Sequence, residues 1–152
     1  KFLFRGFLSR ENKYRNEVLD EIKDYRETII FYEAPHRLNS TLEYLKEKLG
    51  NRRIAICREL TKMHEQIYRG TLEEAISYFE SNRPRGEFVL VLEGKTDEEI
   101  QIEKEALWVD MSIKEHLIKL INEGIDKKEA IKIVAKERDL PKKEVYKYST
   151  EL

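Results

Sequence analysis

Short apolar runs alternate with longer segments of helical periodicity through the first two thirds of the chain. Apolar and β-branched residues concentrate in five runs that predict strands, at residues 2–8, 28–33, 53–58, 65–70 and 88–92. Apolar residues recur at helical spacing in three segments that predict helices, at residues 11–27, 38–49 and 71–79. This alternation favours an α/β fold, in which helices pack on one sheet around a single core.

Two of these helices carry recognisable end signals. Gly50 directly follows the second helical segment and is expected to terminate it. Thr71 and Glu74 have the spacing of a capping box, which predicts that the third helix begins at this point.

The pattern changes after Lys95, where a charged stretch begins and no further strand is indicated. Three short helical patterns follow, at residues 113–122, at residues 127–138 and from Pro141 onward. Three short helices of this kind are typical of a helix-turn-helix unit. We therefore expect an α/β domain over residues 1–95, a linker over residues 96–111 and a helix-turn-helix-like three-helix unit over residues 112–152.

Polar clusters follow two of the predicted strands. One is Glu33-Ala34-Pro35-His36-Arg37 after the second strand, and the other is Arg58-Glu59-Leu60-Thr61-Lys62 at the end of the third. Taken alone, the first cluster is better explained as an ordinary strand-to-helix junction. The second cluster shifts the balance toward a ligand site, because ligand sites of α/β sheets usually lie beyond strand ends. We expect Glu33 and Glu59 to lie in neighbouring loops along one edge of the sheet.

The net charge is close to zero, so any binding of nucleic acid must depend on a local basic patch. Lysine and arginine together number 29 against 30 acidic residues, so no overall positive field attracts nucleic acid. Between residues 51 and 70, however, five bases stand against Glu59 and Glu65: Arg52, Arg53, Arg58, Lys62 and Arg69. Together with Arg10, Lys13 and Arg37 they could form a phosphate-binding face, or they could be solvated surface ions.

Several chemistries lack their usual sequence signals. The chain has no glycine-rich phosphate loop and no nucleophile elbow, and its three histidines do not have a metal-ligand spacing. The single cysteine, Cys57, lies among apolar residues, as a buried structural thiol would. No apolar run approaches the roughly 18 residues that span a bilayer. We expect no metal and a cytoplasmic protein, and the start at Lys1 indicates a piece of a longer one.

Five blocks carry a resemblance to a known family: Gly6-Phe7-Leu8-Ser9-Arg10, Phe31-Tyr32-Glu33-Ala34-Pro35-His36-Arg37, Arg58-Glu59-Leu60-Thr61-Lys62, Arg69-Gly70-Thr71-Leu72 and Gly86-Glu87-Phe88-Val89-Leu90. In this order they resemble the ribosomal RNA small subunit methyltransferase I family of the tetrapyrrole methylase superfamily. The tail resembles the helix-turn-helix segment at the C-terminus of that family. Ser9 departs from the family, which usually has proline there, and His64 stands where an aromatic residue is common.

The resemblance implies a fold, an activity and partners. The fold would be the second domain of the tetrapyrrole methylase fold, a five-stranded mixed sheet flanked by helices, followed by the three-helix unit. The activity would be 2′-O-methylation of a cytidine ribose in 16S ribosomal RNA with S-adenosyl-L-methionine. The chain would be the C-terminal region of a homodimeric enzyme, inactive without the N-terminal domain that it lacks.

The resemblance also assigns residues by position. Residues at the two strand ends would form one wall of the cofactor cleft: Tyr32, Glu33, Ala34, Arg58, Leu60 and Thr61. Four side chains would face the RNA: Arg10, His36, Arg37 and Lys62. Glu33 or Glu59 would orient or deprotonate the ribose hydroxyl, and capping of a helix is an equally open role for each carboxylate.

A second function from another class stays open. The chain could be a non-enzymatic RNA-binding or ribosome-assembly module, which would bind RNA without binding a cofactor. Sequence-specific DNA binding is disfavoured, because the last predicted helix carries lysines and tyrosines but none of the arginine, asparagine or glutamine side chains that most often read base edges.

Overall fold

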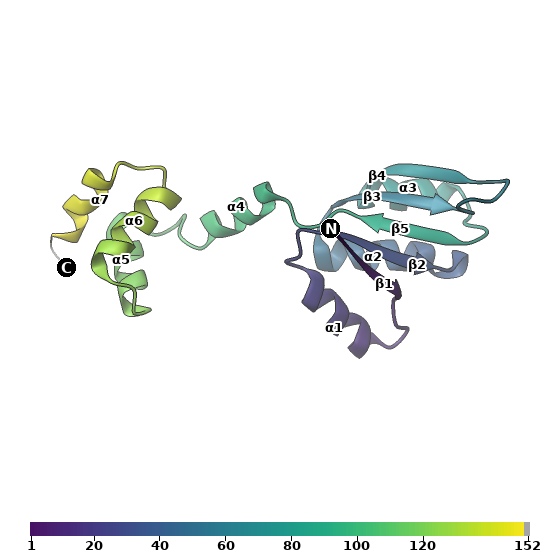
Figure 1. The fold of residues 1–152 in the computed structure, drawn as a ribbon, viewed down its shortest axis with the longest axis horizontal. Helices are drawn as coiled ribbons and strands as arrows, with labels where there is room; N and C mark the ends of the chain where they lie inside the picture. The colour runs from purple at the N-terminus through teal and green to yellow at the C-terminus, as the bar shows by residue number, and fades with distance from the viewer. Residues whose placement is uncertain (151–152) are drawn as a thin grey trace. The chain divides into compact units, whose positions relative to one another are not determined.

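The computed structural model describes residues 1–150, which fall into two compact units (Figure 1). The first unit is Lys1–Thr96, and the second begins at Asp97. The first unit contains five strands and three α-helices: β1 (Phe2–Phe7), α1 (Asn12–Ile22), β2 (Thr28–Glu33), α2 (Leu38–Leu49), β3 (Arg53–Arg58), β4 (Gln66–Thr71), α3 (Leu72–Ser81) and β5 (Phe88–Leu92). A single 3-10 turn, Pro35–Arg37, connects β2 to α2.

The five strands form one mixed sheet in the order β1-β2-β5-β3-β4. Strand β1 is parallel to β2, whereas β5 is antiparallel to both of its neighbours, β2 and β3, and β4 is antiparallel to β3. Figure 1 shows β5 between β2 and β3, although it is the last strand in the sequence. The α/β fold with a five-stranded mixed sheet flanked by helices is confirmed.

One face of the sheet, here called the inner face, carries the core. Ile29 and Phe31 of β2 pair with Leu92 and Leu90 of β5, which in turn pair with residues of β3, and these side chains are buried. All three helices of the unit contribute apolar residues to the same buried cluster. Burying each large aliphatic or aromatic side chain contributes about 1.5–3 kcal/mol, so this cluster is the main source of stability.

The other face, here called the outer face, remains partly open. Ile30 and Tyr32 alternate with the core residues of β2, and Val89 and Val91 do so on β5. None of the four is fully buried, and Tyr32 is 43% exposed. Its ring makes edge contacts with two exposed phenylalanines of β1, Phe4 and Phe7.

The helix ends agree with the sequence signals in two of three cases. Gly50 follows α2 with a φ of 83°, a conformation that glycine adopts without strain. The capping box is present at α3, where Thr71 accepts from the backbone of Glu74 and Glu74 accepts from that of Thr71. Helix α1, predicted over residues 11–27, ends at Ile22. Beyond it the carbonyl of Lys23 accepts a hydrogen bond from a side chain distant in sequence, which the local pattern does not encode.

The second unit is helical in the part of it that the structure describes. Its elements are α4 (Asp97–Ala106), α5 (Ile113–Asn122), α6 (Lys127–Glu137) and α7 (Lys142–Ser149). A small apolar core joins the last three helices through Leu117, Ala130, Val134 and Val145. Helix α4 lies in the segment expected to be a linker and buries none of its residues.

A polar cluster lies at the start of the three-helix unit. The buried His116 of α5 stacks on Trp108, with ring centroids 5.8 Å apart, and its Nδ1 accepts a hydrogen bond from Arg138. The Arg138 guanidinium lies over the Trp108 ring and also donates to the carbonyl of Met111 at 2.6 Å. Residues 108–111, placed in the linker by the sequence, therefore contact the three-helix unit through Trp108 and Met111.

None of the helices in residues 1–150 combines the length and the apolar composition that crossing a membrane requires.

Candidate functional site

Strands β2 and β3 end at the same edge of the sheet. Glu33 at the end of β2 and Arg58 at the end of β3 both pair with Phe88, the first residue of the strand between them. Because β5 is antiparallel to both, β2 and β3 run in the same direction. Two strand spacings, about 10 Å, separate the two ends. The expectation that Glu33 and Glu59 lie along one edge is confirmed.

Four connections meet at this edge, here called the loop edge. They follow β1 (residues 8–11), β2 (residues 34–37) and β3 (residues 59–65), and precede β5 (residues 82–87). Each overlaps or adjoins one of the sequence blocks quoted above. The sheet therefore gathers residues far apart in the sequence into one surface.

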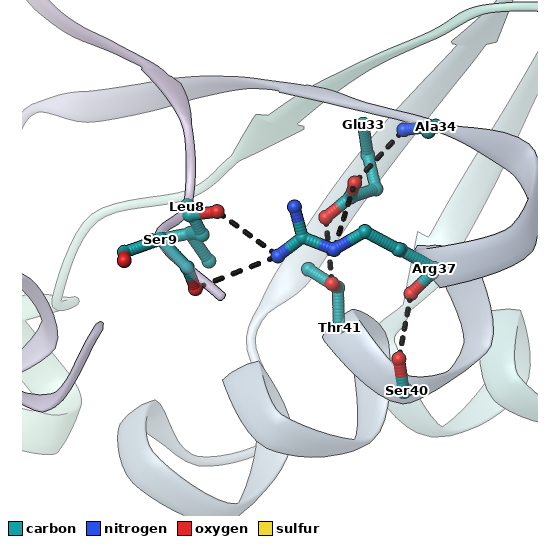
Figure 2. A network of polar contacts seen from close by, with 7 residues as sticks. All are labelled: Leu8, Ser9, Glu33, Ala34, Arg37, Ser40 and Thr41. Atoms are coloured by element: carbon teal, nitrogen blue, oxygen red, sulfur yellow. Dashed lines mark hydrogen bonds and ion pairs between the residues drawn. The ribbon is translucent and has the colours of Figure 1, made fainter. Parts of the chain in front are cut away.

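Glu33 is buried at the loop edge (Figure 2). One carboxylate oxygen accepts from the backbone N–H of Ala34 at 2.8 Å, and the other accepts from the Thr41 hydroxyl at 2.6 Å. The Nε atom of Arg37 lies 3.7 Å from the first oxygen. A buried carboxylate needs such partners, and here they come from the strand end, the 3-10 turn and helix α2. Glu33 thus holds the polypeptide after β2 in place.

Arg37 connects two of the four loops (Figure 2). Its Nη2 atom donates to the carbonyl of Leu8 at 2.9 Å and approaches that of Ser9 at 3.5 Å. These carbonyls belong to the connection after β1. The Arg37 side chain is only 16% exposed, and its contacts with Glu33 and with these carbonyls fix the two loops relative to each other. The family resemblance assigns Arg37 to RNA, which stays a prediction, and in the structure its guanidinium binds backbone carbonyls.

Glu59 joins the loop after β3 to the segment before β5. One of its carboxylate oxygens accepts from the backbone N–H of Glu87 at 2.7 Å, and the other lies 3.4 Å from Nζ of Lys62. The hydrogen bond from Glu87, and secondarily Lys62, lowers the pKa of Glu59 below its ordinary value. Glu59 is therefore an anion at neutral pH and a weak proton acceptor.

Left-handed backbone conformations concentrate in the same loop. Glu59 has a φ of 50° and Thr61 a φ of 67°, both unusual for residues with a side chain. The Thr61 N–H donates to the Glu65 carboxylate at 2.6 Å, which stabilises this turn. Strained backbone of this kind clusters at functional sites, because the surrounding structure must maintain it.

The residues expected at the cofactor lie along the loop edge with different exposures. Tyr32 and Leu60 are 43% and 41% exposed, Thr61 is exposed and Ala34 is half-buried. Arg58 is half-buried, and its guanidinium donates to the carbonyl of Arg85 at 2.7 Å and to Gln66 at 3.0 Å. The edge thus presents exposed apolar side chains beside backbone polar groups.

The residues expected at RNA divide into two groups. Arg10 and His36 are exposed at the loop edge. Lys62 is also exposed, but it pairs with Glu87 at 2.7 Å as well as with Glu59, and these two carboxylates raise its pKa. Of these four side chains, Arg10 and His36 are exposed, Lys62 is exposed and ion-paired, and Arg37 is bound to backbone carbonyls.

The wider basic patch of residues 51–70 is not one surface. Arg52 is 5% exposed and donates to the carbonyl of Lys23, so its assignment to a phosphate-binding face is wrong. Arg53 and Arg69 lie on the outer face, in register with Thr71 and Ala55. Because side chains alternate between the two faces along a strand, Arg53 and Arg58 of β3 lie on opposite faces of the sheet. The bases of residues 51–70 are therefore dispersed.

Two arginines at the loop edge were missed by the sequence analysis. Arg83 and Arg85 flank Pro84 in the connection before β5 and line a hollow together with Arg58. Neither residue belongs to a block or a basic patch that the sequence analysis singled out. A sequence signal was available, because Arg83 and Arg85 lie immediately before β5, the strand that pairs with the ends of both β2 and β3.

Among residues 1–150 there is no group of three or more histidine, cysteine, aspartate or glutamate side chains arranged to hold a metal ion.

Comparison with known proteins identifies relatives along most of the chain. The family model for tetrapyrrole (corrin/porphyrin) methylases matches residues 2–76. A protein of Bacillus subtilis (strain 168), named ribosomal RNA small subunit methyltransferase I, is 48% identical over 145 residues, which are 95% of this chain and 49% of that protein. The protein of the same name from Synechocystis sp. is 41% identical over 153 residues, covering the whole chain and 53% of the relative.

The chain therefore spans about half the length of the curated relatives that it matches. Among solved structures, the methyltransferase CobJ aligns with 62% of this chain and 41% of its own, at 18% identity and a TM-score of 0.48.

Proposed function

Because the chain belongs to the tetrapyrrole methylase family, we propose that it is the C-terminal region of an S-adenosyl-L-methionine-dependent methyltransferase that acts on small-subunit ribosomal RNA. The reaction is 2′-O-methylation of a cytidine ribose in 16S ribosomal RNA. One structural observation carries the proposal. The ends of β2 and β3 flank the start of β5 at one edge, so residues from three sequence blocks form a single wall.

The loop edge fits one wall of a cofactor cleft. Cofactor sites are mostly apolar with a few polar groups that fix orientation. Here Tyr32 and Leu60 supply exposed apolar surface, and the backbone around Ala34 and Thr61 supplies polar groups. S-adenosyl-L-methionine, when bound, supplies an electrophilic methyl group on its sulfonium. A second wall, from the N-terminal domain of the same protein, completes the cleft, so the 152-residue chain alone is inactive.

The two carboxylates have separate tasks in this proposal. Methyl transfer to a hydroxyl needs the reactants in line, and alignment accounts for much of the acceleration in such reactions. Glu33 holds the connection after β2 through Ala34, Arg37 and Thr41, and thereby positions the wall. Glu59 is less buried and ionised, so it orients the ribose hydroxyl as a hydrogen-bond acceptor.

Exposed positive charge at the same edge supports an RNA substrate. Arg10 and His36 are exposed there, and Lys62 extends from the loop after β3. RNA phosphates attract such side chains without sequence preference, and they would hold the substrate against the wall while other contacts select the nucleotide.

Three further properties follow from the proposal. The enzyme works in the cytoplasm, where small ribosomal subunits are assembled. It is a homodimer, as the family resemblance implies. The helix-turn-helix-like unit of α5, α6 and α7 contributes additional contacts to the ribosomal substrate.

A reconstitution experiment tests the proposal. The full-length protein is incubated with small ribosomal subunits and S-adenosyl-L-methionine carrying a labelled methyl group, and the nucleosides of the digested RNA are separated. Label in 2′-O-methylcytidine is expected, and label in a base or no label at all would contradict the proposal.

Calorimetric titration with S-adenosyl-L-methionine separates this function from a non-enzymatic RNA-binding module. Binding is expected only when the N-terminal domain is present with this chain. An RNA-binding module would bind RNA and show no cofactor binding in either case.

A further inference from the structure

The inner face of the sheet has a hollow at the loop edge, beyond the end of β3. Its volume is about 600 Å³, within the range of small-molecule sites. Strands β3 and β4, the C-terminal end of α3 and the connection before β5 enclose it. None of its lining residues is among those expected to bind the cofactor except Arg58.

The charged side chains that line the hollow are all positive. Arg58, Arg83 and Arg85 belong to its wall, and no aspartate or glutamate of residues 1–150 is part of the lining. Arg58 is held in place by the carbonyl of Arg85 and by Gln66. Arg83 and Arg85 are exposed, and in the described part of the chain their side chains form no ion pair. A site with this charge selects an anion.

An aromatic wall adjoins the arginines. Tyr68 and Tyr78 lie with ring centroids 4.9 Å apart, and both contact the buried ring of Phe79. Tyr78 is 45% exposed, so part of its ring is available to a ligand. Its position is fixed by the rings behind it. Exposed aromatic rings beside arginines are the usual means by which proteins bind unstacked RNA bases.

We propose that the hollow formed by Arg58, Arg83, Arg85 and Tyr78 binds one nucleotide of single-stranded RNA, with the arginines on its phosphates and the tyrosine ring against its base. The choice of RNA rests on the proposed function. The hollow lies beside the loop after β3, so this nucleotide is a neighbour of the target nucleotide in the substrate strand. S-adenosyl-L-methionine is a poor match, because its sulfonium and ammonium groups would face three guanidinium groups.

Fluorescence anisotropy of a labelled short single-stranded RNA tests the proposal. The 152-residue chain is titrated into the RNA at several salt concentrations between about 50 and 200 mM. The variant Arg83→Gln/Arg85→Gln is expected to weaken binding about tenfold and to lower the slope of log affinity against log salt by about 1.4, since each lost phosphate contact of single-stranded RNA contributes roughly 0.7.

The matched control is Arg53→Gln/Arg69→Gln. It removes the same charge from two exposed arginines of the outer face, at the other side of the sheet. Affinity and slope within error of the unmodified chain are expected for the control. A control that loses as much as the test variant would show that only net charge matters, and it would overturn the site.

Tyr78 gives an independent test. Tyr78→Phe keeps the ring and is expected to bind as the unmodified chain does, whereas Tyr78→Leu is expected to lose about tenfold in affinity with an unchanged salt slope. Urea unfolding of each variant confirms that the fold is retained. Equal affinities for the phenylalanine and leucine variants would remove the base contact from the proposal.

Two further outcomes separate this proposal from the proposed function. A labelled polyglutamate peptide is titrated in parallel, and arginine-dependent binding of the peptide without binding of RNA would overturn the nucleotide site. In the full-length protein, Arg83→Gln/Arg85→Gln could leave RNA affinity unchanged while the unmodified protein methylates RNA. That result would refute the nucleotide site in the hollow and support the proposed methyltransferase function. Arginine-dependent RNA binding without any methylation would support the nucleotide site and contradict the proposed function.

Discussion

The hydroxyl of Thr41 donates a hydrogen bond of 2.6 Å to the carboxylate of Glu33, where both side chains are buried. This bond joins the first turns of helix α2 to the end of strand β2. It also explains why an ionisable residue can lie inside the core at the loop edge, since its other oxygen is bound by the Ala34 N–H.

Replacing Thr41 with valine removes this donor and keeps the volume of the side chain. An oxygen of Glu33 then stays buried without its partner, and the free energy of unfolding is expected to fall by about 1–3 kcal/mol. Urea unfolding measures the change. Ser40→Ala is the control, because Ser40 is exposed and its hydroxyl donates only to the carbonyl of Arg37. Equal effects of the two substitutions would contradict a special role for the buried bond.

Replacing Glu59 with glutamine in the full-length enzyme tests its proposed role on the ribose. Glutamine retains an oxygen that can accept from the Glu87 N–H, so the loop is expected to keep its shape, while the negative charge is lost. Turnover should decrease more than affinity for S-adenosyl-L-methionine. Steady-state methylation rates and calorimetric titration measure the two quantities, and an unchanged turnover would leave Glu59 with a structural task alone.

Removing the cap of helix α3 is expected to destabilise the first unit. Thr71→Ala deletes the hydroxyl that accepts from the Glu74 N–H, and such losses reduce the free energy of unfolding by about 0.5–2 kcal/mol. Ser77→Ala in the middle of the same helix serves as the control, because its exposed hydroxyl donates only to the Glu73 carbonyl. Chemical denaturation measures the free energy of unfolding of both variants. A smaller loss for Thr71→Ala than for Ser77→Ala would contradict a stabilising role of the cap.

The stability of the second unit is expected to fall as the pH decreases below about 6.5. Burial, and then the nearby Arg138 and Lys119, lower the pKa of His116 from its ordinary 6.5. The unfolded chain therefore binds a proton at a higher pH than the folded chain does, so stability is complete above 6.5 and is lost on acidification toward the lower folded value. Protonation would place a cation against Arg138, whose Nε donates to Nδ1 of the imidazole.

NMR titration of the His116 ring protons measures this pKa directly. A value below 6.5 is expected, and thermal unfolding of His116→Gln should lose that part of its pH dependence. The other groups near the imidazole are Glu137, whose Oε2 lies 3.3 Å from Nε2, Glu123, whose charge raises the pKa of His116, and Trp108, which does not titrate. A pKa above 6.5 would mean that these two carboxylates dominate over burial and Arg138.

A close backbone contact makes Gly94 intolerant of any side chain. A Cβ atom there would lie 2.3 Å from the backbone carbonyl of Arg26, so the chain must shift, and Gly94→Ala is expected to cost about 1–3 kcal/mol. Gly6→Ala is the comparison, because Gly6 has a φ of 63° and a Cβ there would meet only the Phe4 ring at 4.0 Å, so its penalty of about 1 kcal/mol comes from conformation. Equal midpoints in urea would contradict the contact.

Local patterns in the sequence were sufficient for the strands and for most helix limits. The apolar runs match β1 to β5 because β2, β3 and β5 bury one face on the helices, and Leu3 of β1 and Tyr68 of β4 pack against the same cluster. The shared edge of Glu33 and Glu59 was also foreseen, since sites of α/β sheets lie beyond strand ends. These features depend on residues that are close in sequence or on general rules of sheet architecture.

The partners of individual polar side chains were beyond the reach of local patterns. Arg52 was counted as a surface base, but it donates to the carbonyl of Lys23, 29 residues earlier. Arg37 was assigned to RNA, a prediction that stays untested, but its hydrogen bond to the carbonyl of Leu8, also 29 residues away, was not foreseen. Both contacts form only when distant segments fold against each other. The spacing of residues within either segment therefore cannot predict them.

The position of β5 has a consequence for how the polypeptide folds during synthesis. Both inner neighbours of this strand, β2 and β3, are made earlier and have no contact in the ladder with each other. Before β5 is made, the native strand pairs open to the nascent chain are β1 with β2 and β3 with β4, and each pair leaves an unprotected edge. The sheet of the first unit is therefore complete only when the last of its strands to be made joins the two pairs.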